Sequence, residues 1–147
     1  MIKKFLSSVS LIFIGCAAYA QVNSNSFEVT EIIAPVPSFN YAIDDSSNFV
    51  IQIRNLGPNA VSAGDFFDIT YSIFSASGNS GISNDTSIIV TSPMSVGTIS
   101  RFTLLENFAL GNSNENYTAC ADVTGSLVFP ANTNKFPGKC SPFVVSI

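Results

Sequence analysis

Residues 49–58 read FVIQIRNLGP, and residues 67–73 read FDITYSI. In both stretches a large apolar residue recurs at every second position: Phe49, Ile51 and Ile53 in the first, and Phe67, Ile69, Tyr71 and Ile73 in the second. A period of two is typical of a β-strand with one face turned toward a core. Asn55-Leu-Gly57-Pro58 then supplies turn residues that end the first strand. We therefore expect both rows to face one core.

Further apolar runs follow the same pattern along the rest of the chain, separated by Gly, Pro, Asn and Ser. They occupy residues 27–36, 86–91, 99–110, 117–124 and 139–147. Pro35 and Pro37 confine the first run to a sheet edge or end it, and residues 75–84, with little apolar material, are expected to form a loop. Short, evenly spaced strands without a helical period predict an all-β fold. We expect an immunoglobulin-like antiparallel β-sandwich of about seven strands.

The first twenty residues form a signal-peptide pattern. Lys3 and Lys4 precede an apolar stretch over residues 5–18, and Ala18-Tyr-Ala20 supplies the small residues that a signal peptidase reads. The apolar stretch is shorter than the roughly 20 residues that a bilayer core requires. The sequence therefore predicts export and no transmembrane segment.

Cleavage after residue 20 divides the chain into a signal peptide (1–20), a polar leader (21–26) and one domain (27–147). A second processing signal overlaps the first, because Phe13-Ile-Gly-Cys16 resembles the lipobox of bacterial lipoproteins. Phe13 stands where Leu is usual, and no polar segment directly follows the cysteine. We favour a periplasmic or secreted product, with an outer-membrane lipid anchor on Cys16 as the alternative.

Composition excludes several classes of function. After residue 20 the chain keeps four basic residues against ten acidic ones, a net charge of −6. A nucleic-acid backbone would be repelled by this charge, since binding rests on clustered Lys and Arg. The chain has no histidine, which removes the commonest general base and metal ligand. We predict no catalytic, cofactor-binding or metal site.

Two cysteines remain after the signal, Cys120 and Cys140. Exported proteins meet an oxidising environment, so a disulfide is expected, whereas a redox pair or a zinc site would need closer spacing or more ligands. The two positions are symmetric about Pro130, so a final antiparallel hairpin centred there places them opposite each other. The other face of the first strand of this hairpin would then carry Tyr117, Ala119, Ala121 and Val123.

Three segments resemble the CARDB-like and related immunoglobulin-like repeats of secreted and cell-surface bacterial proteins. They are residues 27–35 (FEVTEIIAP), 49–61 (FVIQIRNLGPNAV) and 117–123 (YTACADV), and the resemblance covers about residues 27–147. The strongest local match is the step Asn55-Leu-Gly57. There is a physical reason for it, because Gly57 can take a positive φ and Asn55 can bond to neighbouring backbone groups.

The resemblance implies an adhesive or spacer role. Such domains usually occur as repeats beside an enzyme or a sorting domain, whereas this chain holds one copy, and we expect no C-terminal sorting module because it ends at Ile147. The sequence thus predicts a non-catalytic binding or structural module with a protein or glycan partner at the envelope. The alternative is a self-associating subunit of a surface fibre, joined by strand addition.

Acidic residues offer two further hypotheses. Asp44-Asp-Ser-Ser47 with Asp65 and Asp68 could bind Ca²⁺, although such residues at strand ends more often form turns. A carboxylate pair for glycoside hydrolysis would need two glutamates to meet around a cleft, and nothing in the sequence brings two glutamates within reach of each other. The candidates for such a pair are Glu28, Glu31, Glu106 and Glu115.

Five phenylalanines are difficult to fit inside one small sandwich: Phe74, Phe108, Phe129, Phe136 and Phe143. We favour their capping the ends of the core. In the alternative, Phe129 and Phe136 contact a partner from the long segment between residues 125 and 138.

The two processing signals predict different masses for the exported protein. Cleavage after Ala20 leaves a soluble chain beginning at Gln21, whereas lipoprotein processing leaves a diacylglyceryl-modified chain beginning at Cys16. We expect intact-mass spectrometry of the native protein to show the first. A lipidated mass would reverse the predicted localisation.

Overall fold

The computed structural model describes residues 26–78, 81–110, 114–125 and 138–147. In these ranges the chain contains eight strands, and no helix there could span a bilayer. The strands are β1 (Ser26–Ala34), β2 (Asn40–Ala42), β3 (Ser46–Gly57), β4 (Phe66–Ser75), β5 (Gly81–Ile89), β6 (Ile99–Ala109), β7 (Glu115–Gly125) and β8 (Lys139–Ser146). The predicted signal, Cys16, Phe129 and Phe136 lie outside the described residues.

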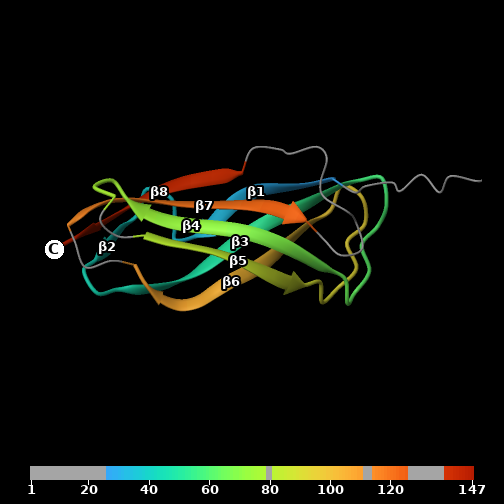
Figure 1. Cartoon of the computed structure of the whole chain (residues 1–147), viewed down its shortest axis with the longest axis horizontal. Helices are drawn as coiled ribbons and strands as arrows, with labels where there is room; N and C mark the ends of the chain where they lie inside the picture. Colours follow the sequence, from blue (N-terminus) through green and yellow to red (C-terminus); the bar gives the residue numbers. More distant parts are fainter. Residues whose placement is uncertain (1–25, 79–80, 111–113, 126–137) are drawn as a thin grey trace, which may run out of the picture.

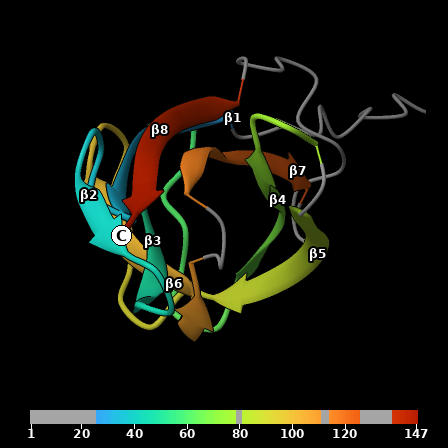
Figure 2. The ribbon, with the colours of Figure 1, turned by 90° about the vertical axis from the view of Figure 1, so that its left-hand side faces the viewer.

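The strands form the two layers of a sandwich (Figure 1). One sheet has the order β1-β3-β6, and the other has the order β2-β8-β7-β4-β5. Viewed end-on, the sheets face each other around a common interior (Figure 2). The predicted all-β, immunoglobulin-like sandwich is confirmed.

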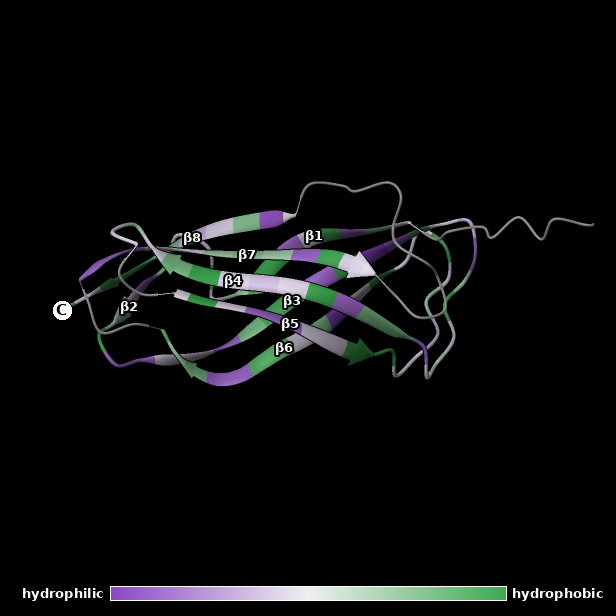
Figure 3. Cartoon of the chain, in the orientation of Figure 1, coloured by the Kyte–Doolittle hydropathy of each residue, from purple (hydrophilic) through white to green (hydrophobic). Residues whose placement is uncertain are grey.

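The alternating rows place their apolar side chains in this interior, as expected. Phe49, Ile51 and Ile53 of β3 are buried, and so is the whole row of β4 from Phe67 to Ile73. The predicted face of β7 is buried as well: Tyr117, Ala119, Ala121 and Val123. Figure 3 shows the resulting alternation of hydrophobic and hydrophilic positions along the strands. Because each strand is apolar on one face, burying both inner faces produces a single core.

One expectation about the strands was wrong. The segment 75–84 is not wholly a loop, because β5 begins at Gly81 and pairs in register with β4, with Ile82 opposite Ile73. This pairing overrides the weak strand propensity of the residues around Asn84. The structure also has an eighth strand, β2, which pairs with β8 in parallel and not antiparallel orientation. Three residues are too few to show a period in the sequence.

The side chain of Asn55 joins three segments at one end of the sandwich. It is completely buried. Its Nδ2 donates to the carbonyl oxygens of Asn59 (2.8 Å) and Met94 (3.0 Å), and its Oδ1 accepts from the N–H of Gly57 (2.9 Å). The backbone of Asn55 is bonded too, donating to Thr98 and accepting from Gly97. One residue thus fixes the end of β3 to the connection between β5 and β6.

Gly57 is required at this junction for two reasons. Its φ of +92° is a conformation that residues with a side chain rarely adopt. A Cβ atom added there would also lie 2.9 Å from Cγ1 of Val96. The Asn55-Leu-Gly57 step noted in the sequence therefore has the turn chemistry expected of it.

Replacing Asn55 with Ala should strongly destabilise the fold. The change removes three side-chain hydrogen bonds and leaves their backbone partners without Asn55, which we expect to lower the free energy of unfolding by about 3 kcal/mol. Denaturant unfolding of the oxidised protein measures this loss. Asn84→Ala, at an exposed position of β5, is the matched control and should change stability by less than about 0.5 kcal/mol. Equal effects of the two substitutions would contradict the role of Asn55.

Candidate functional site

Cys120 and Cys140 form a disulfide between β7 and β8. They are directly opposite each other in the register, as predicted from their symmetry. The Pro142 carbonyl accepts from Ser38 and the Val144 N–H donates to Phe39, so even-numbered residues of β8 direct their backbone groups away from β7. The cysteines therefore occupy a non-hydrogen-bonded pair, where antiparallel strands approach most closely. Their Cα atoms lie 4.1 Å apart.

The candidate calcium residues stabilise turns and strand pairing. Oδ2 of Asp45 accepts from the Ala42 N–H (2.9 Å), and Oδ2 of Asp65 accepts from the Ser62 N–H (2.8 Å). Asp68 lies on the outer face of β4, where its Oδ1 accepts from the Ser87 hydroxyl. Nowhere in the described residues do three or more Asp, Glu, Cys or His side chains gather in a way that could hold a metal ion.

The four glutamates lie on three different strands. Glu28 of β1 forms an ion pair with Arg54 (3.7 Å), in which both side chains are partly exposed to solvent. Glu115 of β7 accepts from the backbone N–H of Ser77 (3.2 Å). Glu106 is exposed on β6, and Glu31 of β1 lines a groove. The groove, and not a glutamate pair, is therefore the feature to consider.

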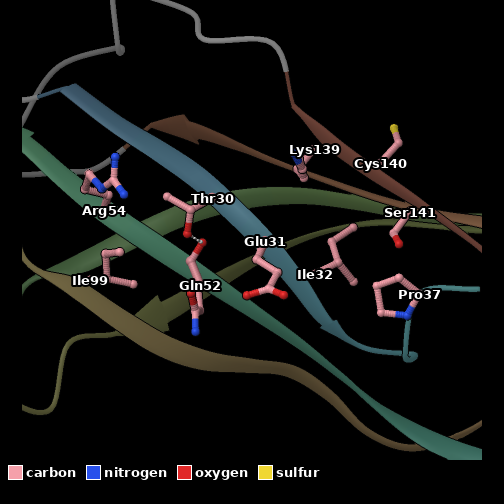
Figure 4. A pocket seen from close by; sticks show the side chains of 10 residues that line it. All are labelled: Thr30, Glu31, Ile32, Pro37, Gln52, Arg54, Ile99, Lys139, Cys140 and Ser141. Atoms are coloured by element: carbon pink, nitrogen blue, oxygen red, sulfur yellow. Dashed lines mark hydrogen bonds between the residues drawn. The ribbon is translucent and has the colours of Figure 1, made fainter.

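This groove lies where the outer face of β1 and β3 meets the start of β8 (Figure 4). It has a volume of about 490 Å³. Its lining combines charged, polar and apolar residues: Thr30, Glu31, Ile32, Pro37, Gln52, Arg54, Ile99, Lys139, Cys140 and Ser141. The open shape and mixed lining suit a polar segment of a larger partner.

The chemistry of the groove is that of binding. Arg54 and Lys139 can donate charge-assisted hydrogen bonds, and Glu31 can accept them. The Thr30 hydroxyl donates to the Gln52 carbonyl oxygen (3.4 Å), and no histidine exists in the chain to activate it. Sequence reasoning did not single out Arg54 or Lys139, which are 85 positions apart. Only the approach of β8 to the other sheet brings them to one groove.

The phenylalanines divide between core and surface. Phe108 and Phe143 are buried in the core, as the favoured interpretation expected. Phe74 is 44% exposed on the outer face of β4, so it does not cap the core. The proposed partner contacts, Phe129 and Phe136, lie outside the described residues, and their role stays a prediction.

Comparisons with known proteins give matches among solved structures alone. No protein-family model matches the chain, and no curated protein sequence matches it. Among solved structures the chain is similar to the CARDB domain of a Pyrococcus furiosus protein, which is described in complex with di-metal ions. The identity is 11%, the match covers 85% of this chain and 94% of that chain, and the TM-score is 0.46.

Removing the disulfide should cost stability without abolishing the sandwich. The bridge closes a loop with a sequence separation of 20, for which the loss of chain entropy in the unfolded state predicts about 3 kcal/mol. We expect Cys120→Ser with Cys140→Ser to reduce the free energy of unfolding by about 2 to 4 kcal/mol in thermal or denaturant melts. If peptide mapping of the unreduced native protein recovered both residues as free thiols, the register of the last hairpin would be wrong as well.

Proposed function

We propose that the chain is an exported, non-catalytic binding or structural module of the bacterial cell envelope. The observation that carries this proposal is the filled interior: the inner faces of both sheets contribute to one apolar core. A ligand must then be bound on the outer surface, which is the usual arrangement in sandwich domains that recognise other macromolecules. The groove beside Glu31, Arg54 and Lys139 is the candidate contact.

Two features support an extracytoplasmic location. The disulfide joins strands that both contribute to the core, and such bridges persist in oxidising compartments. The N-terminal pattern over residues 1–20 has the features of a signal peptide. We propose a mature chain beginning at Gln21, periplasmic or secreted, with lipid attachment at Cys16 as the alternative.

Two hydroxyl groups among the described residues serve to join strands: Thr70 donates to Asp85 (2.6 Å) and Ser46 donates to Asn107 (2.9 Å). The chain supplies no histidine to act as their base. A protein or glycan of the envelope is therefore the proposed partner, in an adhesive or spacer role.

A subunit of a surface fibre is the second candidate. It is favoured by one observation, the free outer edge of β5, because an open strand edge can accept a strand from another chain. Fibre growth requires a head-to-tail contact that repeats without closing. SDS-sensitive polymers of the purified native protein would support this candidate over the simple module.

Binding to cell envelopes tests the proposed function. We expect the labelled protein, purified after export, to bind isolated envelopes saturably, and Lys139→Gln to weaken binding about tenfold through loss of one charge-assisted hydrogen bond. Arg101→Gln removes the same charge from a residue that does not line the groove, so it is the matched control. Absence of saturable binding would contradict the binding role, and equal losses in the two variants would exclude the groove.

A further inference from the structure

The four outer edges of the sandwich differ in how well they are protected. β1 carries three register shifts against β3, and β6 carries two, with Asn107 at a φ of +51°. β2 has three residues. Bulges and short strands are the devices by which proteins prevent edge-to-edge pairing. Three of the four edges therefore have some protection against a second chain.

β5 is the exception. Its nine residues, Gly81–Ile89, pair with β4 in one unbroken register, from Gly81 opposite Phe74 to Ile89 opposite Phe66. The strand contains no proline and no lysine, and Asp85 is its single charge. Figure 2 shows β5 at the outer end of its sheet, next to β4. Within the part of the chain that the structure describes, no strand pairs with the outer edge of β5, and its register has no irregularity that would block the addition of another strand.

The hydrogen bonds around β5 show which backbone groups are free. Directly after β5, the N–H of Val90 donates to the carbonyl oxygen of Asp65 (2.8 Å), and the Val90 carbonyl accepts from the N–H of Gly64 (2.9 Å). Even-numbered residues of β5 therefore direct their backbone N–H and C=O groups toward β4. On the other side of β4, the N–H of Ala76 donates to the carbonyl oxygen of Asn116, so even-numbered residues of β4 bond to β7 and odd-numbered ones to β5. The odd-numbered residues of β5 consequently direct both N–H and C=O to the open edge. They are Gly81, Ser83, Asp85, Ser87 and Ile89, and all five are exposed.

We propose that β5 pairs with β5 of a second copy of this chain, antiparallel about a two-fold axis. The open edge is self-complementary, because each odd-numbered residue offers one donor and one acceptor spaced as an antiparallel partner requires. The two five-stranded sheets would join into one continuous sheet. This interface goes beyond the proposed function, since it concerns how the module is assembled and not what the groove binds.

Charge and exposed apolar surface select the register. A two-fold axis through Asp85 would place two carboxylates directly opposite each other, which is destabilising. An axis through Thr86 instead sets Asp85 opposite Ser87, an uncharged residue, and separates the two carboxylates. The same register sets Ser83 opposite Ile89, which is 65% exposed in the single chain. An axis through Asn84 would avoid the charge clash but would leave Ile89 uncovered.

The interface closes on itself. A two-fold contact uses the same strand in both copies, so it produces a dimer and leaves no free β5 edge for a third chain. One strand pair buries less than the roughly 1,600 Å² of a standard interface. We therefore expect a dimer that dissociates on dilution, and the experiment must cover a series of concentrations.

Sedimentation equilibrium of the native, oxidised protein gives the first test. Ser83→Pro removes an N–H that faces the open edge and is not used by β4, so the fold should be retained. Two intermolecular hydrogen bonds are lost per dimer, and we expect the dissociation constant to rise about tenfold or more. Ser83→Ala keeps the N–H and is the matched control, expected to dimerise as the native protein does. A monomer at all concentrations, or polymers, would overturn the proposal.

Cross-linking tests the register. In a dimer centred on Thr86, the two Thr86 residues form a non-hydrogen-bonded pair, with Cα atoms about 4.5 Å apart. Thr86→Cys should therefore give a covalent dimer on mild oxidation, whereas Ser83→Cys, which faces Ile89 of the other copy, should not. Intact-mass analysis of protein in which the Cys120–Cys140 disulfide is intact detects the covalent dimer directly. Cross-linking of Ser83→Cys alone, or of both variants equally, would overturn the register, and failure of both would overturn the pairing.

Discussion

The buried amide of Asn55 is the constraint on which one end of the sandwich depends. A fully buried side-chain amide must have its donors and acceptor satisfied, and here every partner is a backbone group, either of the last residue of β3 or of a connecting segment. The amide thus substitutes for secondary structure where the chain leaves β3 and where it approaches β6. With those connections fixed, Val61 and Met94 form an isolated bridge and enter the core. Without the amide, the N–H of Gly57 and the carbonyl groups of Asn59 and Met94 would each lose one hydrogen bond.

Much of the fold could be predicted from period-two patterns. The rows on β3 and β4 alternate over a long enough stretch for burial on one face to be read directly from the sequence, and the symmetry of Cys120 and Cys140 predicted the register of β7 and β8. The start of β5 and the existence of β2 could not be predicted. Both depend on pairing with β4 and β8, strands that are distant in sequence or already paired on their other side. Local propensity contains no information about such partners.

The candidate site was less predictable than the fold. The interpretation of aspartates at strand ends as turn formers was correct for Asp45 and Asp65. It could be made from the sequence because an aspartate carboxylate bonds to backbone N–H groups within a few residues of itself. The groove is formed by residues from β1, β3, β6 and β8 together with Pro37, so only the tertiary approach of those strands reveals it. The open edge of β5 has a different origin. It is defined by what does not pair with it in the described chain, which no sequence motif records.

The position of the disulfide has a consequence for how the protein survives proteolysis. Every peptide bond between Cys120 and Cys140 lies within one covalent ring. A protease that cuts the chain once anywhere in this ring would leave two polypeptides still joined through sulfur. β8 would remain tethered beside β7, with Phe143 and Val145 able to keep their places in the core. A domain built in this way can be cut once between the two cysteines and still remain a single molecule.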